Sequence, residues 1–309
     1  MRFAKGHGTG NDFLILPDPG NDLALSPEVI TRICDRRTGL GADGILRAVR
    51  VTPAGRDQAG GPRAPRPDGP QPPQWFMDYR NADGSIAEMC GNGVRVFARY
   101  LLDHGLAEGP DLVLATRAGL RQVREEPDGQ ITVDMGAPVL LGRSAAVIAG
   151  QRYEGTEVSL GNPHLACVVD TPVRGIDLSQ PPATDPARFP DGANVEVLRV
   201  SGAGRLEMRV YERGCGVTQS CGTGAVAAAV AAQATASGAG ANGGTSGSGA
   251  GRGAAPAAAG VWIVHAPGGE LTVTLSDETS LLTGPAVIVA EGEFNQAWLR
   301  DRQLQEAGG

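Results

Sequence analysis

Apolar and polar residues alternate over short runs through most of this chain, which is the period of a β-strand with one buried face. The runs predict strands at 13–16, 45–51, 75–79, 112–115, 131–135, 157–160, 165–169, 195–200, 206–212, 261–265, 271–275 and 287–291. Few helical segments separate these runs, so the pattern favours antiparallel or mixed sheets over a doubly wound parallel sheet.

Two stretches have the pattern of buried helices. After Cys90, apolar side chains recur at helical spacing until Gly105, which predicts a helix with one apolar face. After Cys221, residues 225–232 are apolar on every side, as expected for a helix enclosed by a sheet. This second helix is too short to span a bilayer.

Two regions differ from the rest in composition. Residues 53–74 are crowded with Pro, Gly and Arg, and residues 234–259 are almost wholly Ala, Gly, Ser and Thr. Neither region can bury enough apolar surface to offset the entropy of ordering the chain. We therefore expect both to be disordered surface insertions.

The length and the net charge of the chain limit the classes of function that it can have. A chain of 309 residues predicts about two domains. A net charge of −7 without any basic run argues against nucleic acid or a membrane surface as partner, and favours a small-molecule substrate. The N-terminus lacks the apolar core of a signal peptide, and no apolar run reaches roughly 18 residues, so we expect a soluble, cytoplasmic protein. Five scattered cysteines predict reduced thiols.

The predicted helices begin with almost the same residues, Cys90-Gly91-Asn92-Gly93 and Cys221-Gly222-Thr223-Gly224. Glycines at a helix start let unpaired backbone N–H groups approach an anion, and a cysteine there is expected to be pushed toward the thiolate. The structural alternative is that both Cys-Gly turns merely begin buried helices, but the matched pair disfavours it. No C-x-x-C pair occurs, which argues against a zinc site.

Paired thiols suit the inversion of a carbon beside a carboxylate. One thiolate removes the proton from one face, the opposite thiol returns a proton to the other face, and helix-terminal amides stabilise the carbanion. This scheme requires neither pyridoxal phosphate nor a metal, so we expect no cofactor. Glu212 continues the inward row of strand 206–212 and could tune a thiol or hold an ammonium group. The alternative interpretation is that Glu212 lies at the end of the strand with its side chain turned to solvent.

Residues 39–44 match the G-x-G-x-x-G motif of dinucleotide-binding sites, but the predicted elements on either side of them occur in the wrong order. A helix-like segment, 27–36, precedes them and a strand follows. Dinucleotide binding requires the order strand, loop, helix. We interpret the string as a tight turn.

Four segments together resemble the diaminopimelate epimerase family: 5–13 (KGHGTGNDF), 81–93 (NADGS to CGNG), 161–164 (GNPH) and 212–224 (ERG to CGTG). The resemblance covers almost the whole chain outside the two insertions. It implies an α/β (α+β) fold of two similar domains, each a curved, mostly antiparallel or mixed sheet around a central helix, with the active site in the cleft between them. The expected domains are 1–137 with Cys90, 138–287 with Cys221, and a segment 288–309 returning to the first domain.

Matching positions carry the family's site residues to this chain. The resemblance implies that Cys90 and Cys221 are the acid/base pair and that His164 and Glu212 tune the thiols. It further implies these substrate-binding residues: Asn11, Asn81, Gly91, Asn92, Asn162, Asn194, Glu212, Arg213, Gly222 and Thr223. Cys215 stands where the family commonly has a small residue, and Val217 stands where it commonly has Glu.

The implied activity is cofactor-independent interconversion of LL- and meso-diaminopimelate, in lysine and peptidoglycan precursor biosynthesis, by a chain that could form a homodimer. A proline or hydroxyproline racemase is similar in fold and in its paired cysteines. Segments 161–164 and 212–214 favour a longer, doubly charged substrate instead. An alternative of another class is a thiol redox or thiol-transfer protein that uses a low-pKa cysteine.

Overall fold

The computed structural model describes residues 1–51, 73–236 and 259–300. Both expected insertions therefore lie largely outside the described residues. Residues 234–236 are described, and they continue a helix that we expected to end before them.

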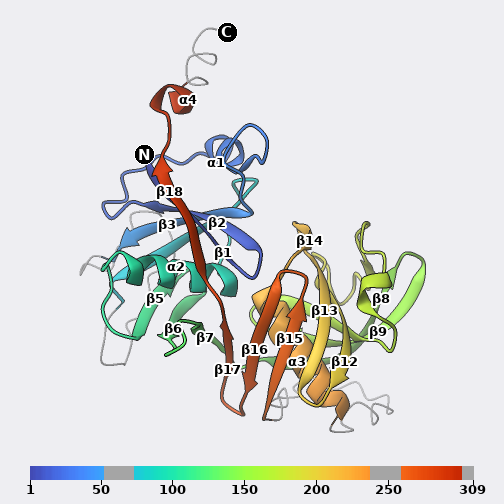
Figure 1. The fold of residues 1–309 in the computed structure, drawn as a ribbon. Helices are drawn as coiled ribbons and strands as arrows, with labels where there is room; N and C mark the ends of the chain where they lie inside the picture. Colours follow the sequence, from blue (N-terminus) through green and yellow to red (C-terminus); the bar gives the residue numbers. More distant parts are fainter. Residues whose placement is uncertain (52–72, 237–258, 301–309) are drawn as a thin grey trace, which may run out of the picture. The chain divides into compact units, whose positions relative to one another are not determined.

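The chain divides into two compact units (Figure 1). The first consists of Met1–Ile131 together with the chain from Pro285, and the second of Thr132–Gly284. The divisions expected from the sequence, after residues 137 and 287, fall a few residues later.

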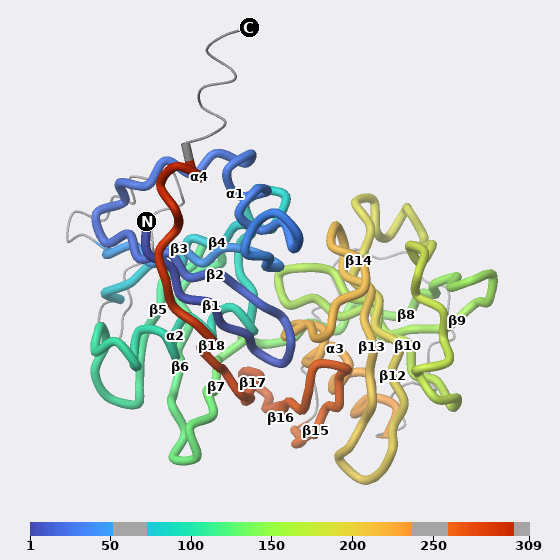
Figure 2. The backbone as a smooth tube through the Cα atoms, turned by 45° about the horizontal axis from the view of Figure 1, so that its top comes forward, coloured from blue at the N-terminus to red at the C-terminus, as the bar shows by residue number. Residues whose placement is uncertain are grey.

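The first unit is a mixed sheet built from three hairpins. Its strands are β1 (Arg2–Gly8), β2 (Asn11–Pro17), β3 (Gly44–Arg50), β4 (Trp75–Asn81), β5 (Asp111–Thr116), β6 (Gly119–Glu125) and β18 (Val287–Glu293). The pairs β1–β2, β3–β4 and β5–β6 are antiparallel, and neighbouring hairpins join through the parallel contacts β2–β3 and β4–β5. β18 returns from the end of the chain to pair with the free edge of β1, as both views show (Figures 1 and 2).

Helix α2 (Gly91–Asp103) lies against this sheet, in contact with β1 to β4 and β18. The short helices α1 (Pro27–Cys34) and α4 (Gln296–Arg300) complete the unit. Ser26 caps α1 by accepting a hydrogen bond from the N–H of Val29, and Pro27 occupies a position whose missing N–H costs nothing.

The second unit repeats this arrangement. Its strands are β7 (Ile131–Gly136), β8 (Val139–Ile148), β9 (Gln151–Ser159), β10 (Pro163–Val168), β11 (Ala183–Thr184), β12 (Asn194–Gly202), β13 (Arg205–Glu212), β14 (Gly216–Thr218), β15 (Gly260–Ala266), β16 (Gly269–Leu275) and β17 (Ser280–Gly284). The antiparallel pairs β9–β10, β12–β13 and β15–β16 are joined by the parallel contacts β10–β12 and β13–β15. Each unit thus has three hairpins, with its main helix between the second and the third.

Helix α3 (Gly222–Ala236) contacts β9, β10, β12, β13 and β15 to β17. Every residue from Gly222 to Ala232 is buried, and its small side chains let strands approach closely on several sides. The predicted mixed sheets around a central helix, twice in one chain, are confirmed.

Six strands were not predicted: β1, β6, β8, β11, β14 and β17. The sequence RFAKGHG of β1 shows no apolar alternation, yet the strand is paired on both sides, with β2 and β18. In β6 the only buried residue is Val123. Pairing with neighbours, rather than local pattern, makes these segments strands.

Among the described residues, no helix combines the length and the apolar character that a membrane crossing requires.

Candidate active site

Cys90 is the N-cap residue of α2. Its sulfur accepts a hydrogen bond from the N–H of Gly93 at 3.5 Å. The first N–H groups of a helix have no intrahelical acceptor, so this turn presents the amides of Gly91 and Asn92 at the positive end of the helix dipole. A carboxylate is the kind of ligand that such a turn binds.

Cys221 forms the same turn at the start of α3. The N–H of Gly224 donates to its sulfur at 3.3 Å, and the N–H of Ala225 donates to its carbonyl oxygen at 2.9 Å. A Cβ at position 224 would lie 2.8 Å from Oε1 of Glu196 and 3.3 Å from the sulfur. A side chain at position 224 would therefore displace the Glu196 carboxylate from the point where the helix start, the thiol and that carboxylate meet.

The two turns differ in their electrostatics. Burial raises the pKa of the Cys221 thiol well above its usual value, and the neighbouring carboxylates of Glu212 and Glu196 raise it further. Hydrogen bonds from Thr223 and Gly224 oppose this shift without cancelling it. The expectation that the helix start lowers the pKa is therefore wrong for Cys221, because desolvation and like charge outweigh the helix dipole. Cys221 rests as a thiol.

A buried chain of hydrogen bonds leads to the Cys221 turn. His164 and Glu196 have fully buried side chains, with Nδ1 of His164 2.8 Å from Oε1 of Glu196. Nε2 of His164 lies 3.1 Å from Oδ1 of Asn162, whose Nδ2 donates to the Thr223 hydroxyl at 3.3 Å. That hydroxyl lies 3.4 Å from the sulfur of Cys221.

Sequence reasoning missed Glu196. The available signal was its position in the apolar strand NVEVLRV, between the buried Val195 and Val197. A carboxylate in such a strand is costly unless it has a partner, and here that partner is His164.

Glu212 lies at the end of β13, half-buried, as its place on the inward row predicted. Burial raises the pKa of its carboxyl group, and hydrogen bonds from the Thr218 hydroxyl and Cys221 oppose the rise. The structure therefore places Glu212 beside the Cys221 thiol.

The surroundings of Cys90 contain an amide and a buried cation. Oδ1 of Asn11 lies 3.6 Å from the Cys90 sulfur and accepts a hydrogen bond from Nδ2 of Asn92 at 3.2 Å. Arg95, further along α2, is fully buried, and its guanidinium donates to the Thr9 hydroxyl at 3.3 Å and to the carbonyl of Pro285 at 3.4 Å.

Arg95 has no carboxylate within ion-pair distance in the described part of the chain. Burial lowers its pKa to about 10, which leaves it charged at neutral pH, and the charge of Cys90 acts in the opposite direction. No sequence signal distinguished Arg95 from other polar residues in helix 91–103.

The remaining expected residues lie at strand ends. Asn81 ends β4 and donates to the Ser85 hydroxyl at 2.9 Å. Asn194 begins β12, where it donates to the carbonyl of Pro163 at 3.1 Å and accepts from the N–H of Arg213 at 3.0 Å. Asn194 thus fixes the loop that carries Arg213, whose side chain is exposed. Asn11, Asn81 and Asn92 accompany Cys90 in the first unit, and the others accompany Cys221 in the second.

Residues 39–44 lie between α1 and β3, the reverse of the dinucleotide order. Over the ranges that the structure describes, no cluster of three or more His, Cys, Asp or Glu side chains is arranged to hold a metal ion. None of the five cysteines, all within those ranges, forms a disulfide.

Solved structures named as an amino-acid racemase and an amino-acid epimerase share this fold. A probable proline racemase from Agrobacterium radiobacter K84 matches with a TM-score of 0.60 at 14% identity, over 96% of this chain and 93% of that one. A hydroxyproline epimerase from Agrobacterium vitis matches with a TM-score of 0.57 at 14% identity, over 94% and 91%. At such low identities these likenesses concern the fold alone.

Sequence comparison identifies the family. The family model for diaminopimelate epimerase matches residues 3–141 and 156–289. Similar curated proteins, each named diaminopimelate epimerase, include one from Thermobifida fusca, 53% identical over 97% of this chain and 100% of its own length. Another, from Mycolicibacterium smegmatis, is 48% identical over 96% and 98%. The chain belongs to the diaminopimelate epimerase family.

Proposed function

We propose that this protein interconverts LL- and meso-diaminopimelate, an isomerase reaction of lysine and peptidoglycan precursor biosynthesis, with Cys90 and Cys221 as its two proton carriers. The observation that carries the proposal is the repeated turn of this chain, in which each cysteine sulfur accepts the N–H of the residue three positions later. It is supported by the similarity of the chain to proteins named diaminopimelate epimerase. A cytoplasmic location, a small-molecule substrate and a homodimeric state complete the proposal.

The chemistry follows from the protonation of the two thiols. The raised pKa of Cys221 makes it the donor in the first step, so Cys90 must act as the thiolate that removes the α-proton. Cys221 then delivers its own proton to the opposite face, which inverts the stereocentre and leaves Cys90 as the thiol. In the next turnover, the reverse reaction uses the same two groups with exchanged roles.

The carbanion needs stabilisation because an amino-acid α-proton is far less acidic than a thiol. Each unit of that pKa mismatch costs 1.36 kcal/mol. One preorganised donor aimed at developing charge contributes about 2.7–4 kcal/mol in other enzymes. The amides of Gly91, Asn92, Gly222 and Thr223 are the donors that we assign to the reacting carboxylate, and no cofactor takes part in the scheme.

The distal end of the substrate carries an ammonium and a carboxylate group. Side-chain amides offer both a donor and an acceptor without net charge, which suits Asn11, Asn81, Asn162 and Asn194. The exposed guanidinium of Arg213 can grip a carboxylate in a bidentate manner. We assign these five residues to distal recognition and His164 and Glu212 to tuning Cys221, with Glu212 also in contact with the substrate.

To test this proposal, the purified protein is incubated in heavy water, without pyridoxal phosphate, with one of three compounds at a time: LL-diaminopimelate, proline or trans-4-hydroxyproline. Only diaminopimelate should be inverted. The product should carry deuterium at the inverted carbon, since the donating thiol is not the one that took the original proton. Inversion of a cyclic imino acid alone, retention of the original hydrogen, or dependence on added pyridoxal phosphate would overturn the proposal.

A further inference from the structure

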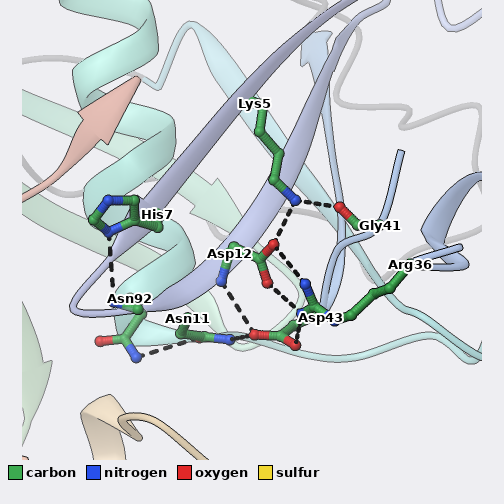
Figure 3. A network of polar contacts seen from close by, with 9 residues as sticks. Lys5, His7, Asn11, Asp12, Arg36, Gly41, Asp43 and Asn92 are labelled. Carbon is green, nitrogen blue, oxygen red and sulfur yellow. Dashed lines mark hydrogen bonds and ion pairs between the residues drawn. The ribbon is translucent and has the colours of Figure 1, made fainter. Parts of the chain in front are cut away.

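The turn formed by residues 39–44 is not used by the proposed reaction, yet its Asp43 lies two hydrogen bonds from Cys90. Oδ2 of Asp43 accepts from Nδ2 of Asn11 at 2.7 Å and from the N–H of Asp12 at 3.1 Å, while Oδ1 accepts from Arg36 at 2.7 Å. Figure 3 shows this network, in which the Asn11 amide bridges Asp43 and Asn92.

Asp43 decides which way the Asn11 amide points. A carboxylate paired with Arg36 can only accept hydrogen bonds, so the edge of the amide that faces it must be the NH₂ group. The oxygen of Asn11 therefore faces the other way, toward Nδ2 of Asn92 at 3.2 Å and the sulfur of Cys90 at 3.6 Å. Asn92 reinforces this orientation because its own NH₂ group needs an acceptor.

The orientation matters for the thiol. An S–H group can donate to the Asn11 oxygen and accept from the N–H of Gly93, so each of these two contacts is a satisfied hydrogen bond. A thiolate would lose the first hydrogen bond and would face a carbonyl oxygen instead. A hydrogen bond to the neutral form of a group disfavours its ionised form.

We propose that Asp43 is a positioning residue: through the Asn11 amide it holds Cys90 as the protonated thiol in the unliganded protein. Asn11 is also one of the residues assigned to the distal end of the substrate. A substrate that engages the Asn11 amide therefore withdraws the acceptor from Cys90. Substrate binding is thus coupled to release of the Cys90 proton to solvent, which leaves the thiolate.

The network contains a matched control. Asp12 is also a carboxylate bound by Arg36, at 2.6 Å, and by Lys5, but its side chain makes no hydrogen bond to the side chain of Asn11. Asp43→Asn and Asp12→Asn each remove one negative charge and one partner of Arg36. Only Asp43→Asn frees the amide to turn its NH₂ group toward the sulfur.

The measurement is the pH dependence of alkylation of Cys90 by iodoacetamide, read by mass spectrometry on the tryptic peptide 81–95, which contains no other cysteine. Asp43→Asn should lower the midpoint pH by about one unit, the size expected for one hydrogen bond. Asp12→Asn should lower it by much less. Cys34, which is buried, should stay unreactive in every variant that is folded.

A double-mutant cycle separates orientation from charge. In an Asn11→Ala background there is no amide to turn, so Asp43→Asn should shift the midpoint no more than Asp12→Asn does. Equal shifts for the two carboxylates in the wild-type background, or an Asp43→Asn shift that survives in Asn11→Ala, would overturn the proposal.

The inference rests on the proposed function where it treats Cys90 as a proton carrier and Asn11 as a residue that meets the substrate. The effect of Asp43 on Cys90 in the unliganded protein does not depend on that function. Alkylation needs no substrate, so failure of the wild-type protein to epimerise diaminopimelate would refute the proposed function and leave the Asp43 result standing. Addition of diaminopimelate to the wild-type protein should lower the midpoint in the same direction as Asp43→Asn.

Discussion

The turn at Cys90 and the turn at Cys221 share a backbone and differ in charge. Each sulfur caps its helix by accepting the N–H three residues later. Around Cys221 the nearby ionisable groups include two carboxylates, Glu212 and Glu196. Around Cys90 they include the buried cation Arg95, which has no carboxylate partner among the described residues. A repeated fold thus supplies the same geometry twice, while unrelated side chains set the two thiols apart.

Each unit also links its cysteine to an acid through an asparagine. In the second unit Glu196 acts through His164, Asn162 and Thr223. In the first unit Asp43 reaches the Cys90 sulfur through Asn11 alone. The two cysteines are thus linked to carboxylates by hydrogen-bond routes of different length.

The largest effect expected is loss of activity when either thiol is removed. Cys90→Ala and Cys221→Ala should each lower kcat for diaminopimelate about 10³-fold or more, since each face of the carbon needs its own proton carrier. Circular dichroism should show an intact fold. As a control, Cys215→Ser removes an exposed thiol outside the helix starts and should retain activity. Full activity in either alanine variant would end the two-thiol mechanism.

A smaller effect is expected when the carboxylate beside Cys221 is neutralised. A like charge disfavours the thiolate, so Glu212→Gln should lower the pKa of Cys221 by about one to two units. The midpoint pH of Cys221 alkylation, measured in a Cys215→Ser background, should fall accordingly. Glu207→Gln is the control, because Glu207 lies on the same strand and pairs with Arg199 instead. A rise of the midpoint in Glu212→Gln would contradict the interpretation that the Glu212 carboxylate raises the pKa of Cys221.

The smallest effect is expected when the cation near Cys90 is removed. It should raise the pH of half-maximal alkylation, whereas Glu212→Gln should lower it. Arg95→Gln removes the buried positive charge while a side-chain amide remains to bond Thr9. The thiolate of Cys90 loses an attractive charge, so its alkylation midpoint should rise, by about one pH unit or less. Arg99→Gln, one turn further along α2, is the control because Arg99 pairs with Glu125 and Asp103. An unchanged midpoint in Arg95→Gln would show that Arg95 acts only in packing.

Local sequence predicted much of this protein. Glycines after a cysteine, followed by apolar residues at helical spacing, predicted both helix starts, because that information lies within one or two turns of chain. The alternating runs predicted most strands for the same reason. The match of segments such as Cys90–Gly93 and Cys221–Gly224 predicted the family, which the comparisons confirm.

Tertiary structure decided the rest. It made a strand of β1 by pairing it on both sides, and it brought Glu196 to His164 across 32 residues of chain. It raised the pKa of Cys221, where the sequence leads us to expect a lowered one. It also placed the Asn11 amide in hydrogen-bond contact with Asp43. The physical reason is that desolvation and charge interactions depend on distances between residues far apart in the chain, and those distances exist only once the strands have paired.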